Sequence, residues 1–262
     1  MTAAGSDSKK KMLINSTVAF VCAGIVAVTL HELAHLLAGL MLGYGSTFYP
    51  SAVNPLAEPS TQHQMVIAAA GPLFSIVSGL LVVLYGRNWG KGFYRLLAMW
   101  FGYLSAQVGF GYCIVAGVMG VGDTAQVLRL MHASWLWYGL VFVFGVGGML
   151  FLARSIAREA VRYCGMDVGM LRNFGLYTWL IGTGVLTALY VYPDSQLPPE
   201  AAGATIAASL TIGVFTPLLT FFYKKVTTKP EPLALGAPTQ GYLSLLALIA
   251  VVLLAAKGVV VG

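Results

Sequence analysis

Charged residues are scarce in this sequence: only 9% of its 262 residues are Asp, Glu, Lys or Arg, whereas 58% are hydrophobic. A soluble domain typically has about 25% charged residues. This composition therefore excludes an ordinary water-soluble domain. Long apolar stretches fit a bilayer instead, because a helix needs about 20 residues to cross about 30 Å of hydrocarbon. The sequence predicts a polytopic membrane protein.

Cysteine is also rare, with three residues in the whole chain. Cys22 and Cys113 fall within predicted membrane spans, and no metal-ligand spacing joins them to Cys164. We expect buried free thiols that pack as small apolar groups, and neither a disulfide framework nor a cysteine-based metal site.

The fold class predicted from the apolar stretches is all-α, with seven transmembrane helices. Helices are favoured over strands because a membrane barrel would show shorter segments that alternate with period two. The predicted spans are 12–42, 65–86, 93–119, 134–153, 173–192, 202–222 and 240–260.

The basic residues predict the orientation of these spans. Of the 15 Lys and Arg residues, only Arg129 and Lys257 lie on the side opposite the N-terminus. The positive-inside rule then places the N-terminus in the cytoplasm and the C-terminus outside. The net charge of +6 indicates topology and attraction to anionic lipid, and no nucleic-acid partner is expected. The 13 residues on the N-terminal side are Lys9, Lys10, Lys11, Arg87, Lys91, Arg95, Arg154, Arg158, Arg162, Arg172, Lys224, Lys225 and Lys229.

A signal peptide is the competing interpretation of the N-terminus, because three lysines precede an apolar run. We reject it, since the run continues into the motif His31–His35 without a small-residue cleavage site. Residues 1–11 are expected to form a polar cytoplasmic tail.

Two segments between the spans stand out. The loop 43–64 contains three prolines and no basic residue, and its piece 46–49 could run extended and offer a strand edge to a peptide. Arg154, Arg158 and Arg162 recur every four residues. This spacing predicts a stripe on one helix face that meets solvent or lipid phosphates.

The first predicted span contains the sequence HELAH at residues 31–35. Ionisable groups inside the hydrocarbon layer cost a few kcal/mol each, so they usually mark function. On a helix, His31 and His35 lie one turn apart on the same face, which is the spacing at which two imidazoles bind one Zn²⁺. Glu32 lies beside them and can accept a proton from an attacking water. The motif predicts one zinc per chain and hydrolysis.

Other cofactors fit this pattern less well. Two histidines on one helix face cannot occupy opposite axial positions of a haem. A di-iron bundle would need Glu-x-x-His motifs on two helices and further glutamates, but the predicted spans contain one glutamate.

A catalytic zinc needs a third protein ligand and an open position. Asp123 is the first candidate, because it follows the third span, which ends on the same side of the membrane as the His31–His35 turn. His63 also faces that side and is the second choice, either as a ligand or as a group that contacts the substrate.

These features together resemble the site-2 protease family of intramembrane zinc metalloproteases. The resemblance covers residues 12–130: HELAH in a transmembrane helix, the Gly71-Pro72 element in the next span, and an aspartate after the third. It implies that His31, His35 and Asp123 bind zinc. It also implies that Glu32 is the catalytic base. The family usually has an asparagine where this chain has Ser75.

The resemblance divides the chain into three parts. The tail 1–11 precedes a three-span, zinc-binding catalytic core at 12–133, and a four-span accessory bundle follows at 134–262. The predicted function is cleavage of a membrane-embedded or membrane-adjacent segment of another membrane protein. The sequence leaves two alternatives open, namely a zinc-dependent lipid amide or ester hydrolase and a membrane protein that binds or transports metal. It does not determine the oligomeric state.

Overall fold

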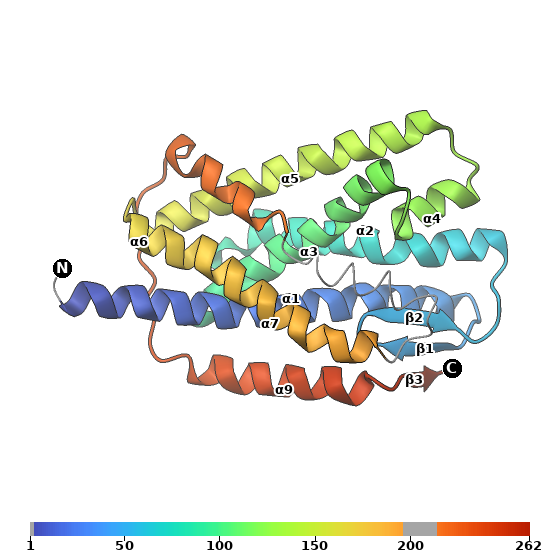
Figure 1. Cartoon of the computed structure of the whole chain (residues 1–262), viewed down its shortest axis with the longest axis horizontal. Coiled ribbons are helices and arrows are strands. Elements are labelled where there is room, and N and C mark those ends of the chain that lie inside the picture. Colours follow the sequence, from blue (N-terminus) through green and yellow to red (C-terminus); the bar gives the residue numbers. More distant parts are fainter. Residues whose placement is uncertain (1–2, 196–213) are drawn as a thin grey trace.

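The computed structural model describes residues 3–195 and 214–262 (Figure 1). Most of these residues are helical, and three short strands form one small sheet. The elements are α1 (Ala3–Met41), β1 (Ser46–Tyr49), β2 (Ala52–Pro55), α2 (Thr61–Tyr85), η1 (Gly86–Asn88), α3 (Gly92–Met119), α4 (Asp123–Leu130), α5 (Trp135–Cys164), α6 (Val168–Leu171), η2 (Arg172–Tyr177), α7 (Thr178–Asp194), η3 (Thr216–Lys225), α9 (Thr239–Ala255) and β3 (Val259–Val261).

Five helical segments are long and apolar enough to cross a membrane. They correspond to the first five predicted spans, and the predicted count of seven is not confirmed. Most of the sixth predicted span, residues 202–213, lies outside the described residues, and its remainder falls largely in η3. The five segments are Ser6–Met41, Thr61–Asn88, Gly92–Met119, Trp135–Cys164 and Val168–Pro193.

The seventh predicted span, 240–260, differs from the structure at its C-terminal end. Helix α9 has 17 residues and stops at Ala255, short of the about 20 residues that a span needs. The valines of β3 then pair antiparallel with β1, with Val260 opposite Thr47. β-branched residues favour such a strand. The all-α prediction missed this three-stranded sheet, whose order is β2-β1-β3.

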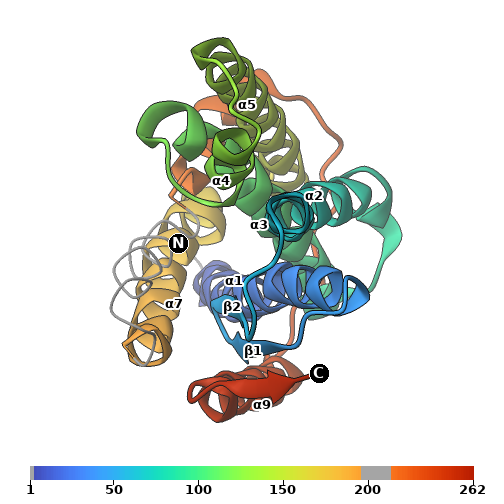
Figure 2. The same cartoon turned by 90° about the vertical axis from the view of Figure 1, so that its right-hand side faces the viewer.

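Helix α1 lies at the centre of the bundle. It packs against α2, α3, α7 and α9, while α5 packs against α3 on the far side (Figures 1 and 2). Trp100 of α3 marks the core of this arrangement: its ring stacks on Phe174 at 5.3 Å and meets the edge of Phe20 at 5.1 Å. Its indole N–H donates to Ser16 Oγ at 3.0 Å. These contacts fix α1 against α3. The predicted boundary between core and accessory helices at residue 133 stays a prediction.

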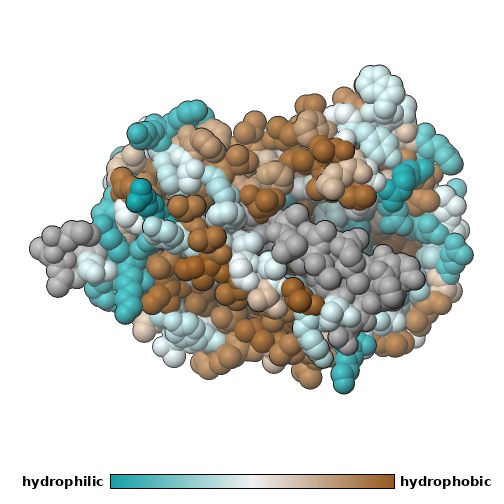
Figure 3. All heavy atoms as spheres, viewed as in Figure 1, coloured by the Kyte–Doolittle hydropathy of each residue, from teal (hydrophilic) through white to brown (hydrophobic). Residues whose placement is uncertain are grey.

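Polar and apolar residues separate along the length of the bundle. On the face shown in Figure 3, hydrophobic side chains cover the middle and hydrophilic ones gather at both ends. The segments that carry the 13 basic residues of the N-terminal side all lie at the end where α1 begins (Figure 1). The sheet and α4 lie at the opposite end. Such a distribution is what a helix bundle that crosses a membrane requires.

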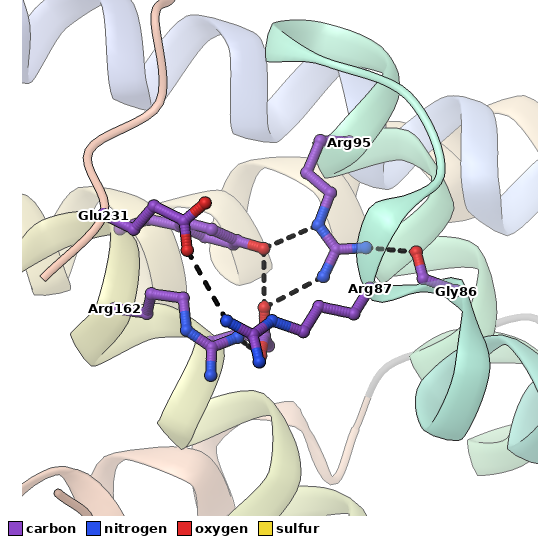
Figure 4. Close-up of polar contacts among 7 residues, drawn as sticks. Gly86, Arg87, Arg95, Arg162 and Glu231 are labelled. Carbon is purple, nitrogen blue, oxygen red and sulfur yellow. Dashed lines mark hydrogen bonds and ion pairs between the residues drawn. The ribbon is translucent and has the colours of Figure 1, made fainter. Parts of the chain in front are cut away.

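A cluster of buried ions ties helices together at the basic end (Figure 4). Arg95 of α3 donates to Glu159 at 3.0 Å, to the Tyr163 hydroxyl at 2.7 Å and to the carbonyl of Gly86. Glu159 also pairs with Arg162. Arg162 is only 7% exposed, so the prediction that it faces solvent or lipid together with Arg154 and Arg158 is wrong for this residue.

Replacing Glu159 with Gln tests whether this cluster stabilises the bundle. The change leaves the buried guanidinium groups of Arg95 and Arg162 without their counter-charge, and breaking a buried ion pair costs about 3–5 kcal/mol. We expect a clear fall in the thermal unfolding midpoint in detergent, followed by circular dichroism.

The matched control is Glu231→Gln. Glu231 pairs with Arg87 at 3.6 Å, and both side chains are more than half exposed. Exposed pairs contribute little, so this variant should unfold close to the wild type. Equal midpoints for the two variants would contradict a stabilising role for Glu159.

Candidate metal centre

The two histidines of HELAH point toward one another from α1. The Nε2 atoms of His31 and His35 lie 3.1 Å apart. Both residues are buried, at 2% and 7% exposure. Met41 ends α1 six residues after His35, so the pair lies about 9–15 Å inside the helix end at a rise of about 1.5 Å per residue.

Asp123 meets this pair from another part of the chain. It is the first residue of α4, and its Oδ2 lies 3.1 Å from His31 Nε2 and 3.2 Å from His35 Nε2. The residue before it, Gly122, has φ of 85°, a left-handed conformation that favours glycine. The chain therefore turns sharply at this point and directs the carboxylate at the two imidazoles.

The three ligand atoms form a nearly equilateral triangle with sides of 3.1, 3.1 and 3.2 Å. A tetrahedral zinc with bonds of about 2.0–2.2 Å holds its ligand atoms about 3.3–3.5 Å apart. The triangle therefore needs to expand by only a few tenths of an ångström to accept the ion. His31, His35 and Asp123 are also the one group of three metal-ligating side chains found together within residues 3–195 and 214–262.

Partners on the far side of each imidazole fix its orientation. His35 Nδ1 lies 2.7 Å from the carbonyl oxygen of Ile67, which can only accept a hydrogen bond, so Nδ1 carries a proton. His31 Nδ1 lies 3.0 Å from Ser75 Oγ. Metal-binding histidines usually have such an outer partner. These contacts leave the Nε2 atoms to face Asp123.

The charge of Asp123 completes the donor set. Burial alone raises the pKa of its carboxyl, but the contacts with His31 and His35 outweigh burial and hold that pKa well below its usual range. An anionic oxygen and two imidazole nitrogens thus converge on one point. When the two Nε2 atoms give up the protons that they share with the carboxylate, all three atoms offer lone pairs, and a metal cation can take the place of those protons. Two nitrogens and one carboxylate oxygen are a donor set that suits zinc.

Helix α2 makes room for the cluster at Gly71. A Cβ atom added there would lie 2.3 Å from His35 Nε2 and 2.6 Å from His31 Nε2. No larger residue fits at this position without moving the imidazoles. The Gly-Pro element of the sequence thus marks the point where α2 passes directly beside the two nitrogens.

Glu32 lies beside the cluster and is 7% exposed. It directly follows His31 on α1. Among the three ligands, Asp123 has the most exposed side chain, at 25%.

His63, the second choice for the third ligand, lies elsewhere. His63 lies in the first turn of α2, where Ser60 is the N-cap. Its Nδ1 is 2.9 Å from the Tyr44 hydroxyl. Gly71 is eight residues further along, which corresponds to about 12 Å of helix. In this structure Asp123 and not His63 is next to the two histidines.

The strand edge expected at 46–49 is not free. Residues Ser46–Tyr49 do form a strand, β1, but it pairs with β2 on one side and with β3 on the other. An added peptide strand would have to pair with an outer strand of the sheet or displace one.

Sequence reasoning missed three contacts of the centre. Ser75 appeared only as a departure from the asparagine of the family, whereas in the structure its hydroxyl lies at His31. The Ile67 carbonyl carries no sequence signal. Tyr112, whose ring stacks on His31 at 5.2 Å, is one of 13 tyrosines, and nothing in its flanking sequence distinguishes it.

A search against models of known protein families, curated proteins and solved structures found no match for this chain.

The third ligand can be tested by metal retention. Asp123→Ala removes the only anionic atom of the triangle. Losing an outer partner of a metal ligand costs up to about 100-fold in metal affinity, so losing the ligand itself should lower zinc affinity by more than about 100-fold. His63→Ala, the matched control, should keep one zinc per chain. Metal content of the purified variants measures both. Zinc lost from the His63 variant but kept by the Asp123 variant would reverse the assignment.

Proposed function

We propose that this chain is an intramembrane zinc metalloprotease that resembles the site-2 protease family. The observation that carries the proposal is the convergence of His31, His35 and Asp123 within 3.2 Å of one another, with Glu32 buried beside them. The two histidines lie in α1, which is long and apolar enough to cross a membrane, and Asp123 lies just beyond the end of a second such helix, α3. A substrate segment must therefore reach it within or next to the bilayer, so we propose another membrane protein as the substrate.

The residues of the centre divide the work of peptide hydrolysis. His31, His35 and Asp123 would hold the ion. Zinc, when bound, supplies Lewis acidity that acidifies water and polarises a carbonyl. Glu32 would accept the proton of the attacking water and transfer it to the leaving nitrogen, which completes cleavage of the peptide bond.

Burial of Glu32 favours hydrolysis over simple metal binding. A site that only holds or transports metal has no need of a fourth ionisable group at 7% exposure, because burying a charge is costly. Hydrolysis of a lipid amide or ester would use the same groups. The substrate that accumulates when the enzyme is inactivated distinguishes a protease from a lipid hydrolase.

We also propose that the basic end of the bundle faces the cytoplasm. Segments carrying 13 of the 15 Lys and Arg residues gather there, as the positive-inside rule requires. The metal centre then lies nearer the outer face. A cysteine placed at Lys9 should react with a membrane-impermeant thiol reagent only after the cells are permeabilised, whereas one at Arg129 should react in intact cells. The reverse pattern would invert the proposed orientation.

The catalytic role is tested by Glu32→Gln. The amide nearly preserves the size of the side chain but is not basic enough to take the proton, and losing a general base costs about 10²–10⁴ in rate. The variant should accumulate in membranes with zinc bound while its substrates remain uncut. Quantitative proteomics of membrane fractions would compare it with the wild type.

Glu58→Gln is the matched control, because it makes the same change at an exposed loop residue and should leave cleavage unaltered. If Glu32→Gln cells showed the same membrane-protein fragments as the wild type, hydrolysis by this centre would be excluded. If uncut lipid accumulated instead of protein, the lipid hydrolase alternative would replace the protease.

A further inference from the structure

Tyr112 connects two parts of the metal centre that come from different helices. Its ring is stacked on the His31 imidazole, with centroids 5.2 Å apart and planes inclined by 11°. The same ring lies against Gly122: a Cβ added at Gly122 would be 2.8 Å from Tyr112 Cδ1 and 2.9 Å from Cε1. One aromatic ring thus touches a ligand on α1 and the residue that precedes the ligand Asp123.

This contact is important because Asp123 begins α4, and the packing of α4 sets where its carboxylate lies. Helix α4 packs mainly against α2 and α3, with a smaller contact to α5. The position of Asp123 relative to α1 is therefore set largely through neighbouring helices. Gly71 provides space from α2, and Tyr112 provides a rigid contact from α3.

We propose that Tyr112 is a positioning residue of the metal centre, whose ring sets the separation between His31 and Asp123 by packing against His31 and Gly122. This inference rests on the proposed metal site and adds to it a residue outside the ligand set. A flat ring suits this role, because stacking restrains the imidazole plane and the ring has few rotatable bonds.

The test uses Co²⁺ as the probe on the full chain in detergent, because the visible absorption of Co²⁺ reports coordination geometry without any substrate. Tyr112→Leu removes the ring. It should weaken Co²⁺ binding by about 10–100-fold, as loss of outer partners does, and shift the absorption bands. Tyr112→Phe keeps the ring, so it should bind with nearly wild-type affinity and spectrum.

Tyr103→Leu is the control for general loss of packing. Tyr103 lies on the same helix, is 1% exposed and packs against Trp100 at 5.9 Å, away from the metal ligands. This variant should unfold at a lower temperature but keep the Co²⁺ spectrum. If Tyr112→Leu does not fold, Tyr112→Met, whose flexible side chain fills the site without a rigid ring, should shift the spectrum in its place.

The outcomes separate this inference from the proposed function. A wild-type spectrum in Tyr112→Leu, an equal loss in Tyr112→Phe, or the same spectral shift in Tyr103→Leu would each overturn the positioning role while leaving the metal site intact. A wild-type chain that binds no Co²⁺ would overturn the metal site, and the role of Tyr112 with it.

Discussion

Two imidazole nitrogens from α1 and one carboxylate oxygen from α4 meet within 3.2 Å of one another. Protons that the imidazoles share with the carboxylate, or a metal cation in their place, hold these polar atoms together, because little water is present to solvate them. The surrounding structure supports this meeting point. The Ile67 carbonyl and the Ser75 hydroxyl orient the rings, Gly71 leaves space for them, and the turn at Gly122 brings in the carboxylate.

The rest of the bundle holds the helices that carry His31, His35 and Asp123 in place. Helix α1 carries both histidines and is surrounded by α2, α3, α7 and α9, so neighbouring helices hold its position in the bundle. The aromatic cluster around Trp100 fixes α1 to α3 near the middle. The ion cluster around Glu159 joins α3 to α5 at the basic end. Two anchors at different depths keep α3, and with it Tyr112, in register with the histidines.

The small sheet lies at the end of the bundle opposite the basic end. Strand β3 comes from the C-terminal part of the described chain and pairs with β1, which follows α1. The sheet lies at the same end of the bundle as α4, close to where Tyr44 contacts His63.

Features that depend on local chemistry could be predicted from the sequence. Composition and apolar length predicted membrane-crossing helices, and five of the seven predicted spans have helical counterparts of sufficient length. The spacing of His31, Glu32 and His35 predicted their shared helix face, because the periodicity of a helix is a local property. The basic residues predicted the charge difference between the two ends, since this depends only on which segments lie between spans.

Features that depend on contacts between distant segments could be found only in the folded chain. Asp123 and His63 were both compatible with the predicted topology, and the packing of α4 on α2 and α3 selected Asp123. The pairing of β3 with β1 and the burial of Arg162 were equally hidden, because both arise from residues far apart in the chain. Tyr112 shows the reason most directly: a tyrosine in an apolar helix has no special local signal, and its role comes entirely from the two segments that the fold brings against its ring.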